Sequence, residues 1–533
     1  MCGCAGRNGV RPGCQDRGIG AMKLRGRWDT VRVKDSGRIG RVNVVADDER
    51  LTPFGGLLVT GEIARNLELV SRVDDAVRGV VRGRPVKQRM RGTTPGELVV
   101  SLAECQLAGG DFFDDLKVLR ADAGSETLRC VAKVPAPQTA LELSSRFNVS
   151  HLHAVERGVA DAFAVLDAKL GRVDRWVTLD VDALPVEVYG KKKADARYMY
   201  GGRFGYQALV GTWAERGRPV AWDLLPGNNG GVGAPCERLL RRALPALPAG
   251  AHHHVRIDSG FYCMSTLDLI RAHDATFTVS VRRFPKLWEL VDAVPADAWT
   301  DADGMDHAQV TETSYRPGDW TGPPLRLVIR RVRLRASDIS TDTRSRRKRT
   351  IPPDQLKLVL DGVIHQTFGY SFVLTNLDET HDSVAVEKLH RDRAQIEERL
   401  KDAKLGMGAR HMPSGKSASN GVWLTACMVA LALASATCDM HPECRASLDA
   451  TSPNAPLAAA LVGANSLTLT PPDPECDNRH IRRHGKALRR LLYCVPARIT
   501  RSARQTTMHL PKHLPWADSF RDTYLTAHAL AAS

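Results

Sequence analysis

The stretch WVTLDVD, Trp176 to Asp182, marks the point where the sequence changes character. Three aliphatic residues fall on one side of the stretch, whereas Asp180 and Asp182 fall on the other. This alternation has the period of a β-strand. The stretch therefore predicts a strand that packs one face against a core and carries two carboxylates on the other face.

Further strand-like and helix-like patterns follow this strand. Gly227-Asn-Asn-Gly-Gly231 is a turn of breaking residues between them. Strands are predicted over residues 206–213, 219–225, 254–258 and 276–281, and helices over residues 236–244 and 264–273. The order β-β-β-α-β-α-β predicts an α/β fold with a mixed sheet.

The remaining sequence divides around this sheet. The pattern predicts a disordered segment or a wrongly assigned start over 1–50, a helical N-terminal DNA-binding or assembly domain over 51–170, a catalytic domain over 171–281 and 374–446, a β-rich insertion over 282–373, and a linker with a basic C-terminal region over 447–533. In the helical part, Thr139–Phe147, a turn at Asn148 and a helix from His151 form a candidate helix-turn-helix. A plain pair of helices is the alternative.

Composition points to a polyanionic partner. The chain of 533 residues has 75 Lys and Arg against 60 Asp and Glu, a net charge of +15. The N-terminus has no apolar signal segment, and Val422–Cys438 predicts a buried helix rather than a membrane span. The twelve cysteines form no pair of CxxC motifs, which argues against zinc and for reduced thiols in a cytoplasm.

A long helix is predicted over residues 383–405. On this helix one apolar stripe holds Leu389 and Ile396, and the neighbouring stripe places a single carboxylate, Glu397, among four cationic or polar residues. Those four are His390, Arg393, Lys401 and Lys404. An ordinary solvated face with ion pairs four residues apart is the alternative interpretation.

Carboxylates also end two of the predicted strands. Asp180 and Asp182 lie on the first strand, and Asp258 ends the fourth, although a helix cap is an alternative role for Asp258. Acids converging from two strands and a late helix repel one another unless a cation lies among them. Carboxylate oxygens suit Mg²⁺ or Mn²⁺, and two such ions can serve phosphoryl displacement.

These residues carry a resemblance to a known family. The run His390-x2-Arg393-x3-Glu397-x6-Lys404 resembles the Y-x2-R-x3-E-x6-K signature of bacterial insertion-sequence transposases, which have an RNase H-like DDE domain. Other phrases are similar to one branch of that family: LDVDALPVEVYG at 179–190, GRFGYQALVG at 202–211, LLPGNN at 224–229, RIDSGF at 256–261 and HMPSGKSASN at 411–420. The resemblance covers roughly residues 50 to 520.

The resemblance implies roles for individual residues. It makes Asp182, Asp258 and Glu397 the catalytic and metal-binding acids, with Asp180 as the alternative first acid, because Ala183 and Leu184 stand where the family has Ser or Thr close by. Arg393, Lys401 and Lys404 would contact phosphates, and His390 replaces the usual Tyr. The insertion of such enzymes often supplies a Trp that stacks on a flipped base; Trp299 and Trp320 are the candidates, with a core position as the alternative.

The expected function is that of a DNA transposase which cleaves the ends of an insertion sequence and joins the freed 3′-hydroxyl to target DNA. Its partners would be terminal inverted repeats, target DNA and a second copy of the chain in a synaptic homodimer, in the nucleoid-associated cytoplasm of a bacterium, without a membrane. Backbone phosphates would be bound by a loop and a basic tail, represented by Arg346, Arg347, Arg482, Arg483, Arg489 and Arg490. An RNase H-like nuclease without strand transfer and an inactive DNA-binding relic are the alternatives.

Overall fold

The computed structural model describes residues 45–531, apart from 82, 90, 171–174, 341, 343–344, 346, 442–484 and 504. The chain divides into two compact units, Met1–Asp48 and Glu49–Ser533, and the elements below all belong to the second unit. Most of the predicted disordered segment lies outside the described residues. The domain boundaries predicted within the second unit remain predictions.

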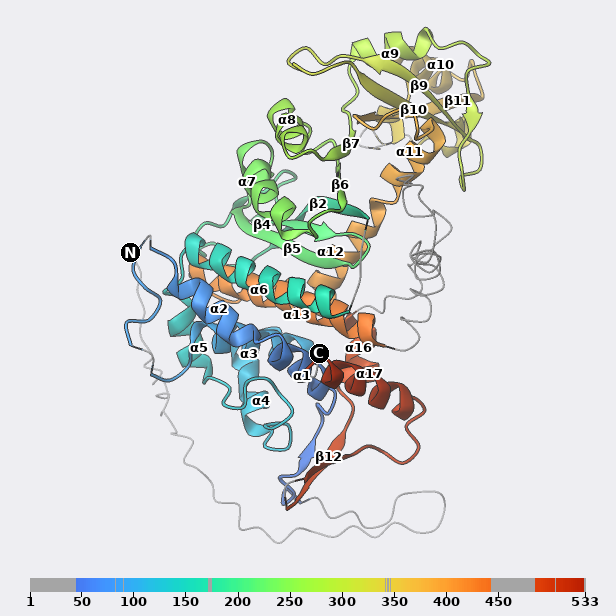
Figure 1. Ribbon diagram of the computed structural model, residues 1–533. Coiled ribbons are helices and arrows are strands. Elements are labelled where there is room, and N and C mark those ends of the chain that lie inside the picture. The colour runs from blue at the N-terminus through green and yellow to red at the C-terminus, as the bar shows by residue number, and fades with distance from the viewer. Residues whose placement is uncertain are drawn as a thin grey trace, which may run out of the picture. The chain divides into compact units, whose positions relative to one another are not determined.

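A ten-stranded mixed sheet forms the centre of the unit, which confirms the predicted mixed α/β fold (Figure 1). Its strand order is β3-β4-β2-β6-β7-β11-β10-β9-β8, and β5 pairs with β4 on the side opposite β2. Strands β2, β6 and β7 run parallel to one another, and all other pairs are antiparallel. The bounds are β2 Trp176–Glu187, β3 Arg197–Tyr198, β4 Phe204–Trp213, β5 Arg218–Pro226, β6 His252–Ile257 and β7 Thr276–Ser280.

The predicted strands and helices of this region are all present. Helices α7 (Ala234–Ala243) and α8 (Met264–Ala272) connect the strands at the predicted places. Val177, Leu179 and Val181 of β2 share a core with the apolar faces of both helices. The other face of β2 is buried as well, because Thr178 and Asp180 are covered by polar partners. Thus the alternation in the sequence separates an apolar face from a buried polar face.

The predicted insertion extends the same sheet. Its last strand, β11 (Gln366–Thr375), pairs with β7, so that Val373 lies opposite Ser280. The remaining elements are α9 Pro285–Asp292, β8 Thr300–Asp301, β9 Ala308–Tyr315, β10 Leu325–Arg335, η3 Ala336–Asp338, η4 Arg347–Thr350 and α10 Pro353–Leu360. Strand β10 pairs with β11 over a long antiparallel register, from Arg326 opposite Thr375 to Arg335 opposite Gln366.

Helices upstream of β2 pack around the long apolar helix α13 (Ser417–Met440). Their bounds are α1 Leu57–Asn66, α2 Leu69–Arg78, α3 Pro95–Leu107, η1 Phe113–Asp115, α4 Leu116–Ala121, α5 Pro137–Ser144 and α6 Val149–Lys169. By length and composition alone α13 could cross a membrane, but 94% of its apolar window is buried inside the protein. The prediction of a buried helix is confirmed.

Two local features of the helical region follow from the backbone. Glu68 takes a left-handed conformation (φ 49°) and separates α1 from α2. The predicted pair of helices joined at Asn148 is present as α5 and α6. Asn148 caps α6, since its side chain accepts a hydrogen bond from the amide of His151 at 3.0 Å.

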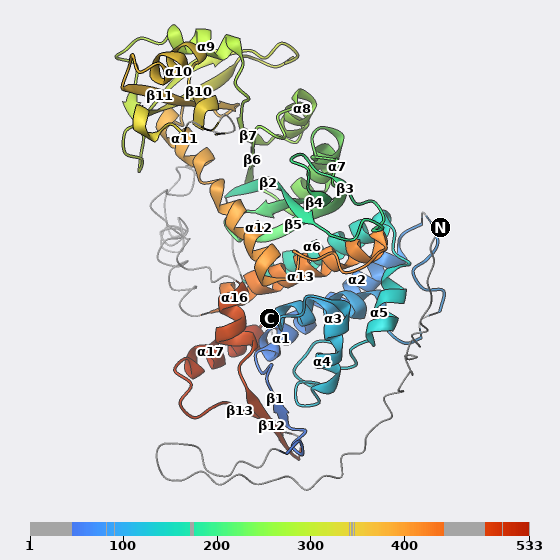
Figure 2. The same cartoon turned by 180° about the vertical axis from the view of Figure 1, so that it is seen from behind.

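The C-terminal region returns to the start of the unit. Strand β12 (Ala497–Ser502) pairs with β1 (Leu51–Thr52) and with β13 (Gln505–His509) in a small antiparallel sheet (Figure 2). Helix α17 (Ala517–Ala529) packs near α1, and the short α16 (Gly485–Leu488) continues into a π-helical turn, η6 (Arg489–Tyr493). The two ends of the unit therefore stabilise each other.

Candidate active site

Asp182 and Asp258 lie on neighbouring parallel strands at the same edge of the sheet. The register pairs Val181 of β2 with Ile257, the last residue of β6, so the next residues along the two strands are the two aspartates. Aligned residues of parallel strands point to the same face and stand about 4.8 Å apart at their backbones. The Oδ1 atom of Asp258 accepts a hydrogen bond from the amide of Gly260 at 2.7 Å, which holds the carboxylate at the strand end.

Asp180 has a different environment. The same register places it opposite Arg256, whose guanidinium donates two hydrogen bonds of 2.7 Å to its two carboxylate oxygens. Both side chains are buried, and Arg256 also donates to the carbonyl oxygen of Leu389. Both carboxylate oxygens of Asp180 thus bind a buried cation. Asp182 lies two residues further along β2, beyond the last residue that pairs with β6.

The third acid comes from a helix that is broken. The prediction of one helix over residues 383–405 is wrong, because the chain forms α11 (Ser383–Arg391) and α12 (Ala394–Gly406) with a break at Asp392 and Arg393. The consequence is that His390 and Glu397 do not belong to one continuous helical face. Arg393 stands at the break, with its guanidinium 3.2 Å from Oδ2 of Asp182 and 3.3 Å from the carbonyl oxygen of Val181.

The charges of the three acids act on one another. Burial, with smaller contributions from the negative charges of Asp258 and Glu397, raises the pKa of Asp182 to about 6 against the opposing effect of Arg393 and the amide of Ala183. Glu397 is exposed near the start of α12, while Ile396 and Leu400 bury the opposite side of the helix.

The raised pKa of Asp182 predicts a distinct pH dependence of stability. Between about pH 4 and pH 6 the folded protein retains a proton that the unfolded chain has released, so the contribution of this group is present below pH 4 and is lost as pH rises to 6. We expect the free energy of unfolding of the wild type to fall over this interval relative to that of Asp182→Asn. Urea unfolding of both proteins at several pH values measures the difference, and parallel pH profiles would contradict it.

A cavity of about 220 Å³ opens beside Glu397, between α11, α12 and strands β7, β10 and β11. His390 and Arg393 line it, and three buried nitrogen atoms in its wall have no hydrogen-bond partner among the described residues: Nδ1 of His390, Nε of Arg330 and Nε of Arg393. Burial lowers the pKa of His390 to about 3, and its Nε2 is paired with the hydroxyl of Ser280 at 2.8 Å. The cavity is therefore polar and rich in arginine, with a neutral histidine in its wall.

Sequence reasoning missed an ion triad at this cavity. Glu387 of α11 binds Arg330 of β10 and lies 3.2 Å from Nε of Arg391. The spacing of Glu387 and Arg391, four residues apart on a helix, was a usable signal. The contact of Arg330 with Glu387 could not be predicted from the sequence, since it depends on the packing of β10 against α11.

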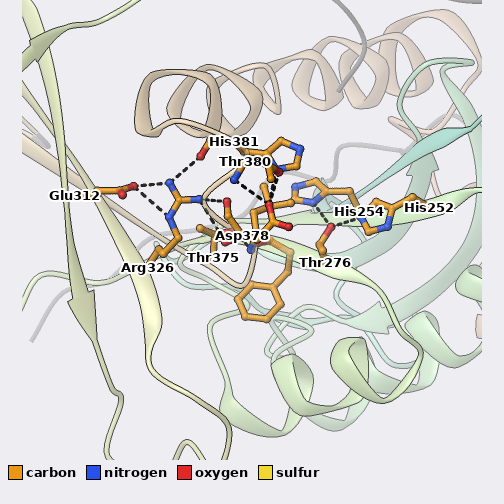
Figure 3. Close-up of polar contacts among 11 residues, drawn as sticks. His252, His254, Thr276, Glu312, Arg326, Thr375, Asp378, Thr380 and His381 are labelled. Carbon is orange, nitrogen blue, oxygen red and sulfur yellow. Dashed lines mark hydrogen bonds and ion pairs between the residues drawn. The ribbon is translucent and has the colours of Figure 1, made fainter. Parts of the chain in front are cut away.

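The loop before α11 is fixed by a network of polar contacts (Figure 3). Arg326 of β10 forms an ion pair of 2.5 Å with Glu312 and also donates to the carbonyl oxygens of Leu377, Asp378 and His381. On the other side of the loop, the hydroxyl of Thr375 donates to the carbonyl oxygen of Phe277 at 2.6 Å. The insertion therefore holds the segment that leads to Arg393 and Glu397.

The remaining predicted phosphate and base contacts near the site have mixed environments. Lys401 is exposed, and Lys404 donates to the carbonyl oxygen of Pro185 at 3.4 Å. Trp320 is buried, with its Nε1 donating to the carbonyl oxygen of Pro323 at 2.6 Å. Trp299 is partly buried beneath the guanidinium of Arg331, which lies 4.0 Å from its ring centroid. Neither ring is presented freely to a base.

The predicted basic loop and tail are only partly described. Arg346, Arg482 and Arg483 lie outside the described residues. Arg347 donates to the carbonyl oxygen of Asp338 at 3.2 Å, and Arg490 is exposed. Arg489 has an internal role, because it donates to the carbonyl oxygens of Gln106 and Leu107 at the end of α3.

The carboxylate oxygens of Asp182, Asp258 and Glu397 are the kind of donor that suits a divalent cation. Within the described ranges, no three His, Cys, Asp or Glu side chains are grouped closely enough to hold a metal ion as they stand. Arg393, bound to Asp182, supplies the positive charge at this edge in the structure.

Comparison with known proteins gives three findings. A family model described as "Transposase DDE domain group 1" matches residues 35–344, a range that holds Asp182 and Asp258 but ends before Glu397. No curated protein matches the chain. Among solved structures, the cryo-EM structure of a piggyBac transposase synaptic complex with hairpin DNA is similar, with a TM-score of 0.35 and 12% identity over 78% of this chain and 87% of that one.

Proposed function

The chain belongs to the transposase DDE domain family, group 1, whose model matches more than half of it, and on that premise we propose that it is a DNA transposase that cleaves element ends and transfers the 3′-hydroxyl to target DNA. The observation that carries the proposal is the register of β2 and β6, which brings Asp182 and Asp258 side by side, with Arg393 of the segment before Glu397 bound to Asp182. We further assign it to the insertion-sequence enzymes of the Y-x2-R-x3-E-x6-K signature group.

An RNase H-like arrangement of the catalytic domain is part of this proposal. It is supported by the strand order β5-β4-β2-β6-β7, in which three strands meander and two follow in parallel through α7 and α8. In such an arrangement the first acid lies on the central strand, the second at the end of its parallel neighbour, and the third on a later helix. Asp182, Asp258 and Glu397 occupy those positions.

Asp182, Asp258 and Glu397 would hold Mg²⁺ or Mn²⁺, two ions in our proposal, because DDE transposases generally depend on divalent metal. When bound, the metal supplies the Lewis acidity needed for phosphodiester hydrolysis and transesterification. Arg393, which lies beside Asp182, would bind a phosphate oxygen, as would Lys404 of α12, whose side chain reaches the carbonyl oxygen of Pro185 on β2. Asp258 is held in place by the amide of Gly260.

The partners of the proposed reaction are terminal inverted repeats and target DNA. Both ends of an element must be cut together, so we propose a homodimer in the synaptic complex, acting in a bacterial cytoplasm. The test uses DNA that carries the element's own ends. We expect nicks that leave 3′-hydroxyl groups at both ends with Mg²⁺ and none with EDTA; cleavage that persists in EDTA would overturn the metal-dependent mechanism.

Gly260 offers a milder perturbation of the same site. A Cβ atom added there would lie 2.9 Å from Oδ1 of Asp258, closer than such contacts allow, so Gly260→Ala must displace the carboxylate. We expect cleavage to slow by about tenfold to a hundredfold with little change in melting temperature. Gly318→Ala is the control, because a Cβ at Gly318 meets no atom within 4 Å. Equal rates for both variants would contradict the assignment of Asp258.

A further inference from the structure

Exposed aromatic side chains gather in one short segment, Tyr189 to Arg203, between β2 and β4. Of the four Phe, Tyr and Trp side chains that are exposed among the described residues, three belong to this segment: Tyr189 (91% exposed), Tyr198 (61%) and Tyr200 (97%). The fourth is Phe112. Single exposed apolar residues are ordinary on a protein surface, but three rings within twelve residues are not explained by chance exposure.

The segment is anchored beneath these rings. Ala196 and Met199 are buried, and the backbone of Met199 exchanges hydrogen bonds with Gly202 and Arg203 in a turn that carries Tyr200 at its tip. Gly201 and Gly202 both have positive φ angles, which this turn requires. The backbone amide of Ala194 donates to the carbonyl oxygen of Gly415 at 3.0 Å. The rings are therefore held outward from a fixed base.

The segment is also cationic. It contains Lys191, Lys192, Lys193, Arg197 and Arg203, with Asp195 as its acid and Glu187 just before it. Lys193 is turned inward to the carbonyl oxygens of Met412 and Ser414. Lys191, Lys192 and Arg203 are exposed, and among the described side chains they form no ion pair within 4.0 Å. The exposed rings thus stand among cations that a polyanion could bind.

The segment continues the catalytic edge of the sheet. Beyond Val181 strand β2 loses its partner β6 but stays paired with β4 as far as Glu187, so the two strands project past Asp182 toward the segment (Figure 2). The five residue steps from Asp182 to Glu187 span about 16 Å, the rise of about five stacked nucleotides, and the three rings follow beyond Glu187. Lys404 lies between, at the carbonyl oxygen of Pro185, and continues the positive charge from Arg393.

We propose that Tyr189, Tyr198 and Tyr200 form a stacking platform for unpaired DNA bases that lie more than about five nucleotides from the phosphodiester that is cut. In duplex DNA the base faces are covered by stacking, whereas unpaired bases can stack on an exposed ring beside cations that bind the backbone. A second copy of the chain is a poorer occupant, because the surrounding cations would repel an equally basic partner. The inference rests on the proposed function only in taking DNA as the substrate.

The test measures DNA binding by fluorescence anisotropy with the full-length protein in EDTA. The probes are a labelled single strand of about 15 nucleotides and its duplex. We expect Tyr189→Ala/Tyr198→Ala/Tyr200→Ala to bind the single strand about tenfold or more weakly and the duplex nearly unchanged, since stacking on even one base corresponds to about that factor. The triple Tyr→Phe variant keeps the rings and is expected to bind as the wild type does.

Two further variants control the result. Phe112→Ala removes an exposed ring elsewhere and should leave binding unchanged, whereas Lys191→Ala/Lys192→Ala should weaken both probes and reduce the salt dependence. Single-strand affinity that does not fall in the triple Ala variant, or falls equally with the duplex, would overturn the platform. The platform would also be overturned if the wild type formed a dimer in sedimentation and the triple Ala variant did not. A wild type that cleaves DNA yet fails this test would leave the proposed function standing.

Discussion

Asp258→Asn and Glu397→Gln are each expected to abolish metal-dependent cleavage while the protein stays folded. Each change removes one negative oxygen donor from the coupled set at the sheet edge and preserves side-chain volume. Loss of a ligand from a catalytic metal site removes several kcal/mol of transition-state stabilisation, or about 10³-fold in rate or more. The rate of 3′-hydroxyl formation on element-end DNA, with Mg²⁺ and with Mn²⁺, measures the effect.

Neighbouring acids provide matched controls for these two changes. Glu398 is exposed beside Glu397 on α12, and Asp268 of α8 is partly exposed and paired with Arg271 of the same helix. Glu398→Gln and Asp268→Asn should cleave at the wild-type rate. If Glu397→Gln retained cleavage while Glu398→Gln lost it, the third acid would have to be reassigned. Unchanged circular dichroism for all four variants separates a catalytic loss from unfolding.

Asp180→Asn is expected to lose stability, whereas Asp182→Asn is expected to lose cleavage and keep its stability. Asp180→Asn leaves the buried guanidinium of Arg256 without its bidentate partner, which should cost about 3 kcal/mol of stability. This loss is at the low end of the usual range for a broken buried ion pair, because the charge of Glu215 also stabilises the charged form of Arg256. Asp182→Asn removes a carboxylate whose charged form burial disfavours, so its stability at neutral pH should equal or exceed that of the wild type, with cleavage lost.

Denaturant unfolding and cleavage assays on the same preparations distinguish the two variants. Arg256→Met added to Asp180→Asn should restore much of the lost stability, because it removes the unpaired buried charge. A stable Asp180→Asn protein without activity, together with an active Asp182→Asn protein, would exchange their roles and make Asp180 the first acid.

The sheet was predictable because its strands keep strict patterns. WVTLDVD and HVRID place apolar residues at every second position. Breaking residues such as Gly227–Gly231 mark the turns between the strands. The buried α13 was readable from its composition, since 17 uncharged residues suit a core better than a membrane. These features depend on local pattern alone, which a single sequence contains.

The site was harder to predict because it depends on pairing and on a helix break. Alternation places Asp180 and Asp182 on one face and cannot separate them; only the register between β2 and β6 gives Asp180 to Arg256. The helix break at Asp392 and Arg393 contains no glycine or proline that would indicate it in the sequence. It follows from tertiary contacts, since Arg393 turns toward Asp182.

A joining assay with a pre-cleaved element end and a supercoiled target plasmid separates a transposase from a nuclease. We expect Mg²⁺-dependent products in which the 3′-hydroxyl is joined to target strands, with a constant stagger between the two joined ends, and no products from Glu397→Gln. Cleavage of element DNA without any joined product would contradict this expectation and make the protein a nuclease. Joining that survives in Glu397→Gln would contradict the assignment of the three carboxylates.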